Sequence, residues 1–349
     1  MILPPPEVIE LITEDRFRIL LTHYSRKTKD SKGPVLVVHG GSVGSKMFTL
    51  PTVDKNFAQF LYEEGYDIWL LDWRASINLP VRLSTLADAA EFDFPAAVKF
   101  IQKNTDEAKR DSIHAVVHCI GSLAFFMSVQ RGWVTGVRSI AAQAVALHPI
   151  VGTVEKAKTA IHLAARLRKL GITEVSPLAD PMYPLYSAVV RAMVNSAHHE
   201  CTSTICHKLT FMYGHAFLHD TLNLETHGRL AEQFGPCNLM TLMHVEQCIQ
   251  LGHMAAYDYG IAGNLEKYGT EVPPNCIDDA SKFKDVKVRL ISGEFNQLFV
   301  PLSTEATLQW LKRKNPKGDY ERVLIKGYGH WDVFAGATAS RDCYPELIK

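Results

Sequence analysis

The sequence predicts an α/β fold in which a mostly parallel central sheet has helices on both faces and an inserted helical cap. Short apolar runs rich in β-branched residues alternate with segments of helical spacing in residues 1–148 and again in residues 285–349. Strands that are buried on both faces of a parallel sheet have this composition, and helices connect such strands. In residues 149–284 the alternation stops and mostly helical patterns remain. We therefore expect one core in two parts, interrupted by a helical cap or lid.

The apolar runs define the individual elements. PVLVVHG at 34–40 and DIWLLDW at 67–73 are continuous apolar runs, as expected of buried strands. A turn rich in Lys, Ser and Gly at 26–33 is expected to end an opening hairpin. The remaining predicted strands cover 17–23, 112–118, 137–147, 286–293 and 320–327, and the predicted helices cover 55–64, 87–105, 121–132 and 303–314.

Composition excludes several classes of protein. The chain has 349 residues, 47% of them hydrophobic, which is enough for a large core. Its 37 Lys and Arg residues balance 37 Asp and Glu residues, so no basic surplus indicates binding to nucleic acid or to an anionic membrane. The charged N-terminal region is unlike a signal peptide, and the apolar runs are too short to span a bilayer. We predict a cytoplasmic protein with no stable membrane insertion, and the sequence is compatible with a homodimer.

The seven cysteines are scattered along the chain, a pattern unlike a secreted disulfide framework. One group combines Cys201 and Cys206 with nearby histidines, namely His198, His199 and His207. The Cys-x4-Cys spacing leaves a metal site or a thiol pair open, but no second ligand pair follows at a standard zinc distance. We therefore expect ordinary packing or a local thiol pair here, and no metal.

Two turns compete as the site of a catalytic nucleophile. The stretch from Gly40 to Gly44 spells G-x-S-x-G around Ser42, the spelling of a nucleophile elbow. The stretch HCIGS at 118–122 lacks that spelling but places Cys119 in a similar turn. An elbow needs a strand, a sharp turn and a helix that begins at once, because the helix N-terminus supplies an N–H group and partial positive charge.

The residues that follow each turn favour Cys119. After Ser42 comes SKMFTLPTVD, which contains Pro51 and has no apolar periodicity. After Cys119 come the small residues Gly121 and Ser122 and then an apolar helical segment. Cys119 also comes after about three core strands, where an elbow belongs. We predict that Ser42 is not the nucleophile and that the early turn supplies the N–H of Gly41 to an oxyanion.

Five motifs occur in the order of the α/β-hydrolase fold, and the chain resembles its lipase- and esterase-like members. They are HG at 39–40, GYDIWLLDWR at 65–74, HCIGS at 118–122, GEFNQLFVP at 293–301 and GYGHWD at 327–332. More narrowly, KLTFMYG at 208–214 and HDTLNLETH at 219–227 resemble the hydrolase domain fused to cholesterol-oxidase-type flavoproteins. The chain has no G-x-G-x-x-G flavin motif, so we expect no cofactor.

The resemblance implies a triad with two departures from the usual Ser and Asp. Cys119 stands at the nucleophile position and His330 in GYGH at the base position, while Asn296 occupies the acid position. Glu294 and Asp332 lie close in sequence and remain alternatives for the third member. A thiol beside a histidine at a helix N-terminus is expected to form a thiolate–imidazolium pair, which needs a carboxylate less than a serine does.

We predict that Cys119 attacks the carbonyl of an ester, a lactone or a thioester, with the N–H groups of Gly41 and Ile120 holding the oxyanion. The alternatives are an acyltransferase or cyclising enzyme that uses the same cysteine, and a binding protein that has lost catalysis. We expect His118 and Asp72 to be structural. The cap is rich in Met, His and aromatic residues, which suggests a small hydrophobic substrate; its candidate contacts are Met212, Tyr213 and His219.

Overall fold

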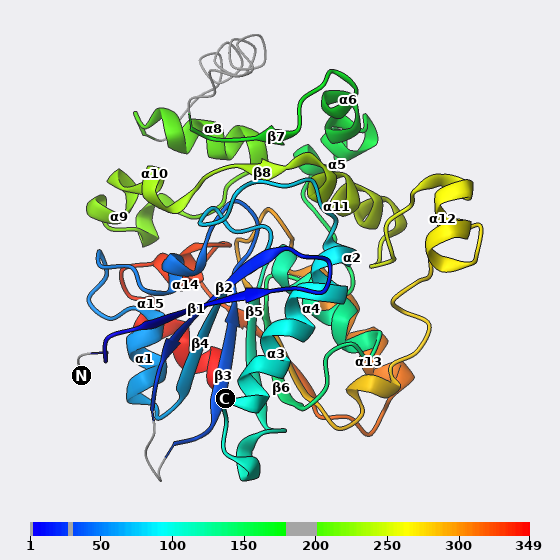
Figure 1. The fold of residues 1–349 in the computed structure, drawn as a ribbon. Coiled ribbons are helices and arrows are strands. Elements are labelled where there is room, and N and C mark those ends of the chain that lie inside the picture. The colour runs from blue at the N-terminus through cyan, green and yellow to red at the C-terminus, as the bar shows by residue number, and fades with distance from the viewer. Residues whose placement is uncertain (1–2, 27–30, 179–200) are drawn as a thin grey trace.

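The fold centres on one eight-stranded sheet. The computed structural model describes residues 3–26, 31–178 and 201–349. The strand order is β1-β2-β4-β3-β5-β6-β9-β10 (Figure 1). Six strands run parallel, namely β4, β3, β5, β6, β9 and β10. Strand β2 pairs antiparallel with β1 and with β4. The strands are β1 Glu7–Ile12, β2 Arg18–Tyr24, β3 Pro34–Val38, β4 Asp67–Asp72, β5 Ile113–His118, β6 Val137–Gln143, β9 Lys287–Gly293 and β10 Tyr320–Ile325.

The structure confirms the predicted core strands and corrects the start of the chain. The opening hairpin is formed by β1 and β2, because Glu7 pairs with His23 and Ile12 with Arg18. The segment predicted as that turn, part of which lies outside the described residues, instead separates β2 from β3, and these strands have β4 between them in the sheet. The sequence interpretation had no strand at β1, because its Glu residues and apolar residues do not form the continuous apolar run of a buried strand.

Helices cover both faces of the sheet. Side chains alternate along a strand, so Val35 and Val37 pack on one face of the sheet, while Leu36 and Val38 pack on the other. The first face is covered by α1 Phe57–Glu63, α14 Asp332–Ala335, α15 Ala339–Asp342 and α16 Tyr344–Ile348. The second face is covered by α2 Leu86–Asp88, α3 Phe94–Lys103, α4 Ile120–Gln130 and α13 Leu302–Lys314.

The chain between β6 and β9 is mostly helical, and its described part from α5 to α11 lies over the carboxyl ends of the parallel strands (Figure 1). It contains α5 Thr153–Ala160, α6 Leu163–Lys169, β7 Glu174–Val175, α8 Thr204–Tyr213, η4 His219–Thr221, α9 Leu224–Gly228, α10 Leu230–Gln233, β8 Cys237–Asn238, α11 Leu239–Leu251, α12 Gly260–Tyr268 and η5 Ser281–Phe283. The short strands β7 and β8 pair with each other, apart from the main sheet. We refer to residues 144–286 as the insertion.

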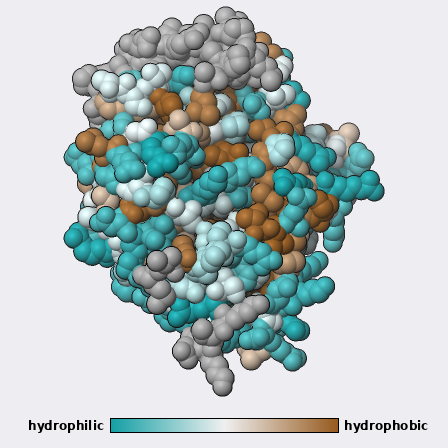
Figure 2. All heavy atoms as spheres, turned by 60° about the vertical axis from the view of Figure 1, so that its left-hand side comes forward, coloured by the Kyte–Doolittle hydropathy of each residue, from teal (hydrophilic) through white to brown (hydrophobic). Residues whose placement is uncertain are grey.

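The surface carries scattered apolar groups. On the face shown in Figure 2, apolar side chains gather in several patches that hydrophilic side chains separate. Val8 and Ile12 on the edge strand β1 are among the exposed apolar residues of the molecule. Within the three described stretches, every helix is too short or too polar to cross a lipid bilayer.

Candidate active site

Cys119 lies at the turn between β5 and α4. Its backbone has φ 56° and ψ −135°, and α4 begins at the next residue, Ile120. A positive φ is strained for a residue with a side chain, and such strain is typical of functional sites. The turn is held by a 3.1 Å hydrogen bond from the Cys119 N–H to the Gln143 carbonyl, at the end of β6. The predicted strand, sharp turn and immediate helix are therefore all present around Cys119.

Two glycines allow the turn to pack closely against the loop that follows β3. A Cβ atom on Gly121 would lie 2.2 Å from the His39 carbonyl oxygen, a backbone atom that has little freedom to move. A Cβ atom on Gly40 would lie 2.6 Å from the Cβ of Cys119. The absence of a side chain at these two positions therefore lets the first turn of α4 and the β3 loop approach each other.

This close approach directs two backbone N–H groups at the cysteine. The N–H groups of Ile120 and Gly41 both interact with the sulfur of Cys119 and favour its ionised form. Burial raises the pKa of the Cys119 thiol to about 11, and these two donors only partly offset that rise. The donors are the two that the sequence predicts for an oxyanion.

His330 follows β10 and comes close to Cys119. The sulfur of Cys119 and one ring nitrogen each of His118 and His330 lie within 4.8 Å of one another. Burial, followed by the neighbouring His118, lowers the pKa of His330 well below its usual value. Both shifts favour a neutral thiol beside a neutral imidazole in the resting protein, rather than the expected thiolate–imidazolium pair.

Asn296 lies on the far side of the His330 ring. Its Oδ1 is 3.2 Å from His330 Nδ1, and because an amide oxygen only accepts, Nδ1 carries the proton. The Nε2 lone pair of His330 is then the one available to take a proton. Asn296 is 2% exposed, and its Nδ2 has no hydrogen-bond partner among the described residues. A carboxylate oxygen at the place of this amide would not leave a donor unpaired.

The two alternative carboxylates make other contacts. Asp332 accepts hydrogen bonds from the Gly329 N–H, at 2.9 and 3.0 Å, and from the Thr221 hydroxyl, at 2.8 Å. Glu294 is exposed and accepts a 3.1 Å hydrogen bond from the Gly327 N–H. The structure thus brings Cys119, His330 and Asn296 together, whereas the hydrogen bonds of Glu294 and Asp332 fix turns of the backbone.

Gln143 is a site residue that the sequence interpretation missed. Its Nε2 donates a 3.1 Å hydrogen bond to the His330 carbonyl, and its Oε1 is hydrogen-bonded to Nδ1 of His118. Burial lowers the pKa of His118 to about 3, so this imidazole is neutral. Gln143 therefore fixes both histidines from β6, and its role follows from the neighbouring positions of β5 and β6 rather than from any local motif. This arrangement agrees with the predicted structural role of His118.

Ser42 also has a positive φ, 57°, but lies in a different setting. Its hydroxyl is hydrogen-bonded to the Tyr213 hydroxyl of α8, and only the short 3-10 turn η1 Ser45–Phe48 follows it. Asp72 fixes this loop, as expected: it accepts hydrogen bonds of 2.8 Å from the N–H and 2.6 Å from the hydroxyl of Ser45.

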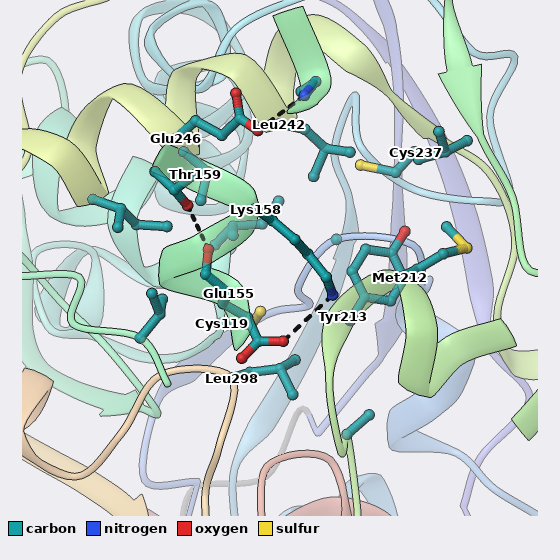
Figure 3. A pocket seen from close by; sticks show the side chains of 18 of the residues that line it. Cys119, Glu155, Lys158, Thr159, Met212, Tyr213, Cys237, Leu242, Glu246 and Leu298 are labelled. Atoms are coloured by element: carbon teal, nitrogen blue, oxygen red, sulfur yellow. Dashed lines mark hydrogen bonds and ion pairs between the residues drawn. The ribbon is translucent and has the colours of Figure 1, made fainter. Parts of the chain in front are cut away.

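A cavity of about 440 Å³ lies between the insertion and the sheet, with Cys119 in its wall. Figure 3 shows Cys119 and Leu298 among the lining residues, together with Met212 and Tyr213 of α8. The lining is largely apolar, with contributions from α5, α6, α8 and α11. The polar exceptions include Glu155, Lys158, Thr159 and Glu246.

Two of the three substrate contacts predicted for the cap line this cavity. Met212 and Tyr213 contribute to its wall, whereas His219 does not and instead lies 3.4 Å from the sulfur of Cys206. The sequence interpretation missed wall residues such as Phe234 and Cys237, since their position depends on how the insertion folds over the sheet.

Comparison with known proteins gives distant relatives that are lipases. The chain is 23% identical over 331 residues to triacylglycerol lipase 1 of Arabidopsis thaliana, covering 90% of this chain and 79% of the lipase. It is 24% identical over 366 residues to lipase lipl-3 of Caenorhabditis elegans, covering 98% of this chain and 88% of that protein. No family model matches the chain.

The fold of this chain is also similar to folds of solved structures. A soluble variant of monoglyceride lipase from Saccharomyces cerevisiae, in complex with a substrate analog, superposes with a TM-score of 0.57 at 12% identity. The match covers 100% of this chain and 96% of the lipase. The predicted fold class is thereby confirmed, and the finer resemblance to domains fused to flavoproteins stays a prediction.

Proposed function

We propose that this chain, which has the α/β-hydrolase fold of lipases and esterases, cleaves an ester, lactone or thioester of a hydrophobic compound through an acyl intermediate on Cys119. One observation carries the proposal: the Cys119 sulfur lies in a strained strand-to-helix turn, faces two backbone N–H donors, and has His330 beside it. These are the three elements that acyl transfer needs, namely a nucleophile, an oxyanion site and a base.

In the first half of the reaction, the Cys119 sulfur forms a bond to the substrate carbonyl carbon. His330 Nε2 takes the thiol proton in the same step, so that no thiolate has to persist in the buried site. The negative charge that develops on the carbonyl oxygen is held by the N–H groups of Gly41 and Ile120. The bond from the carbonyl carbon to the leaving group then breaks, and the leaving group takes the proton from His330.

In the second half, a water molecule attacks the carbonyl carbon of the thioester. His330 removes a proton from the water, the carbon–sulfur bond breaks, and the sulfur regains a proton from His330. Asn296 keeps Nδ1 of His330 protonated and the ring in place, but it does not neutralise the imidazolium. A thiol, whose pKa is far below that of a serine hydroxyl, makes this lack of a carboxylate tolerable.

The cavity supports a hydrophobic substrate. Its wall is apolar on most sides, and the few polar groups come mainly from α5 and α11, away from the sheet. A pocket of this kind binds an acyl chain or a fused ring system by burying apolar surface. The names of the sequence relatives point in the same direction, since they are lipases. In this proposal the insertion acts as the cap that closes the site from above.

The apolar wall also favours a second candidate reaction, acyl transfer to an acceptor other than water. A thioester that is shielded from bulk water lives longer, which gives an alcohol or amine, or a second group of the same substrate, time to attack it. The same residues would act in the same roles, and only the second nucleophile would differ. The acyltransferase and cyclising alternatives belong to this candidate.

The test is turnover of p-nitrophenyl esters and acyl thioesters of increasing chain length by the full chain and by Cys119→Ala. Hydrolysis that increases with acyl length and is lost in the variant supports the proposal. Turnover that appears only when an alcohol or amine is added supports the second candidate. Binding of the same compounds with no turnover by the unmodified chain would instead show a binding protein and overturn both.

A further inference from the structure

A second group of nucleophilic and metal-binding side chains lies in the insertion, outside the proposed active site. We call it the Cys-His cluster, and its members are Cys201, Cys206, His219 and His227. Each member offers one ligand atom, and these four atoms all lie within 4.8 Å of one another. The sequence places Cys201 and Cys206 near His198, His199 and His207, of which His198 and His199 lie outside the described residues. The two histidines that the fold brings in, His219 and His227, were missed because they follow later in the chain.

The spacing of the ligand atoms suits a tetrahedral metal ion. In such a zinc site, Zn–S bonds of about 2.3 Å and Zn–N bonds of about 2.0–2.1 Å set the ligand atoms about 3.3–3.8 Å apart. The Cys206 sulfur and His219 Nε2 are already 3.4 Å apart. Because all four ligand atoms lie within 4.8 Å of one another, shifts of about 1 Å or less would bring them to these spacings around an ion.

Two observations on individual members are compatible with metal binding by the cluster. Nε2 of His227 is buried and has no hydrogen-bond partner within the described part of the chain. None of the cysteines is in a disulfide. His207 has another task, because its Nε2–H donates a 2.6 Å hydrogen bond to the Cys201 carbonyl and so fixes that loop.

The cluster brings together two pieces of the insertion, one of which lines the cavity. Cys206 is in α8, which carries Met212 and Tyr213 to the cavity, whereas His219 begins η4. The segment of η4 is anchored to the core, since the Thr221 hydroxyl donates a 2.8 Å hydrogen bond to Asp332. A link between the two pieces would therefore fix one wall of the cavity relative to the loop that carries His330.

We propose that the Cys-His cluster binds one zinc ion, and that this ion is structural. Two thiolates and two imidazoles are a ligand set that zinc favours, and four protein ligands leave no open position for a substrate or a water. The ion ties α8 to the segment formed by η4 and α9. This site does not depend on the proposed activity of Cys119, and it would stand if that activity were disproved.

The experiment measures metal content of the full chain, produced in medium that contains zinc and purified without chelators. We expect about one zinc per chain by elemental analysis. In Cys206→Ser and in His227→Gln, the zinc content should fall about ten-fold or more. The matched controls are His215→Gln, an exposed histidine between α8 and η4, and Cys276→Ala, a buried cysteine elsewhere; both should keep the zinc.

Replacement of zinc by Co²⁺ in the unmodified chain keeps the test decisive if a variant does not fold. Thiolate-to-cobalt charge-transfer absorption together with strong visible bands of tetrahedral cobalt would support the site. Absence of stoichiometric zinc and of this spectrum would overturn it. A disulfide between Cys201 and Cys206, found by non-reducing peptide mapping of protein whose free thiols were alkylated at lysis, would overturn it as well.

Discussion

Two turns of this protein look alike at the backbone and differ in what surrounds them. Ser42 follows β3 and Cys119 follows β5, which are neighbouring strands, and the two residues have φ values of 57° and 56°. Only the serine turn carries the literal G-x-S-x-G. An α-helix begins at the residue after Cys119, and two backbone N–H groups interact with the Cys119 sulfur; within the described residues, the serine turn has neither feature.

The comparison shows that an elbow is defined by its geometry and not by its spelling. The hydroxyl of Ser42 is occupied by the Tyr213 hydroxyl, and the loop around it is fixed by Asp72. Within this loop, Gly41 contributes an N–H to the neighbouring turn. In the proposed mechanism the two turns form one site together: the first supplies a donor for the oxyanion, and the second supplies the nucleophile.

The largest expected effect distinguishes the two turns directly. Cys119→Ala should lower kcat/KM for a p-nitrophenyl ester by about 10³-fold or more, because it removes the nucleophile. Ser42→Ala should keep kcat within about ten-fold, because its hydroxyl contacts only the cavity wall. The measurement is steady-state kinetics on both variants, with circular dichroism to show that each is folded. Loss of activity in Ser42→Ala alone would reverse the assignment.

The next effect tests why a cysteine is paired with an asparagine. Cys119→Ser should lower kcat/KM by about 10²-fold or more, since a serine hydroxyl needs a carboxylate behind the histidine. Adding Asn296→Asp to the Cys119→Ser variant should raise its kcat/KM about ten-fold, because a carboxylate stabilises the imidazolium. Asn296→Asp alone should change activity much less. Equal effects of Asn296→Asp in both backgrounds would contradict this account.

A smaller effect concerns the close approach of the two turns. Gly121→Ala should reduce the free energy of unfolding by about 2 kcal/mol or more, since its Cβ would lie 2.2 Å from a backbone oxygen. Gly44→Ala in the serine turn should reduce the free energy of unfolding by less, because its Cβ would meet the end of the Asn78 side chain, which can move. Urea unfolding of both variants gives the comparison, and equal losses would count against a tight elbow at Cys119.

The smallest effect concerns the resting charge of the nucleophile. Burial raises the pKa of the Cys119 thiol to about 11, so the thiol is protonated at neutral pH. The rate of alkylation of Cys119 by iodoacetamide should therefore rise about ten-fold per pH unit from pH 6 to pH 9, with no plateau. Peptide mass spectrometry follows this cysteine separately from the other six. A plateau that begins below pH 8 would indicate a thiolate–imidazolium pair instead.

The sequence predicted the parallel core because its strands are continuous apolar runs, and it located Cys119, His330 and Asn296 because they lie at strand ends in a known order. It missed β1, whose charged residues hide an edge strand. It also missed Gln143, which acts through the pairing of β6 with β5, and the histidines of the Cys-His cluster. These roles depend on contacts between segments that are far apart in the sequence, and local sequence patterns do not predict such contacts.

The most direct test of the central claim is the mass of the protein during turnover. The full chain is mixed with an activated ester, quenched in acid within seconds, and digested for peptide mass spectrometry. The account predicts an acyl group on the peptide that contains Cys119, lost when that residue is alanine, and none on the peptide that contains Ser42. An acyl group on Ser42, or turnover that continues after Cys119 has been replaced, would contradict it.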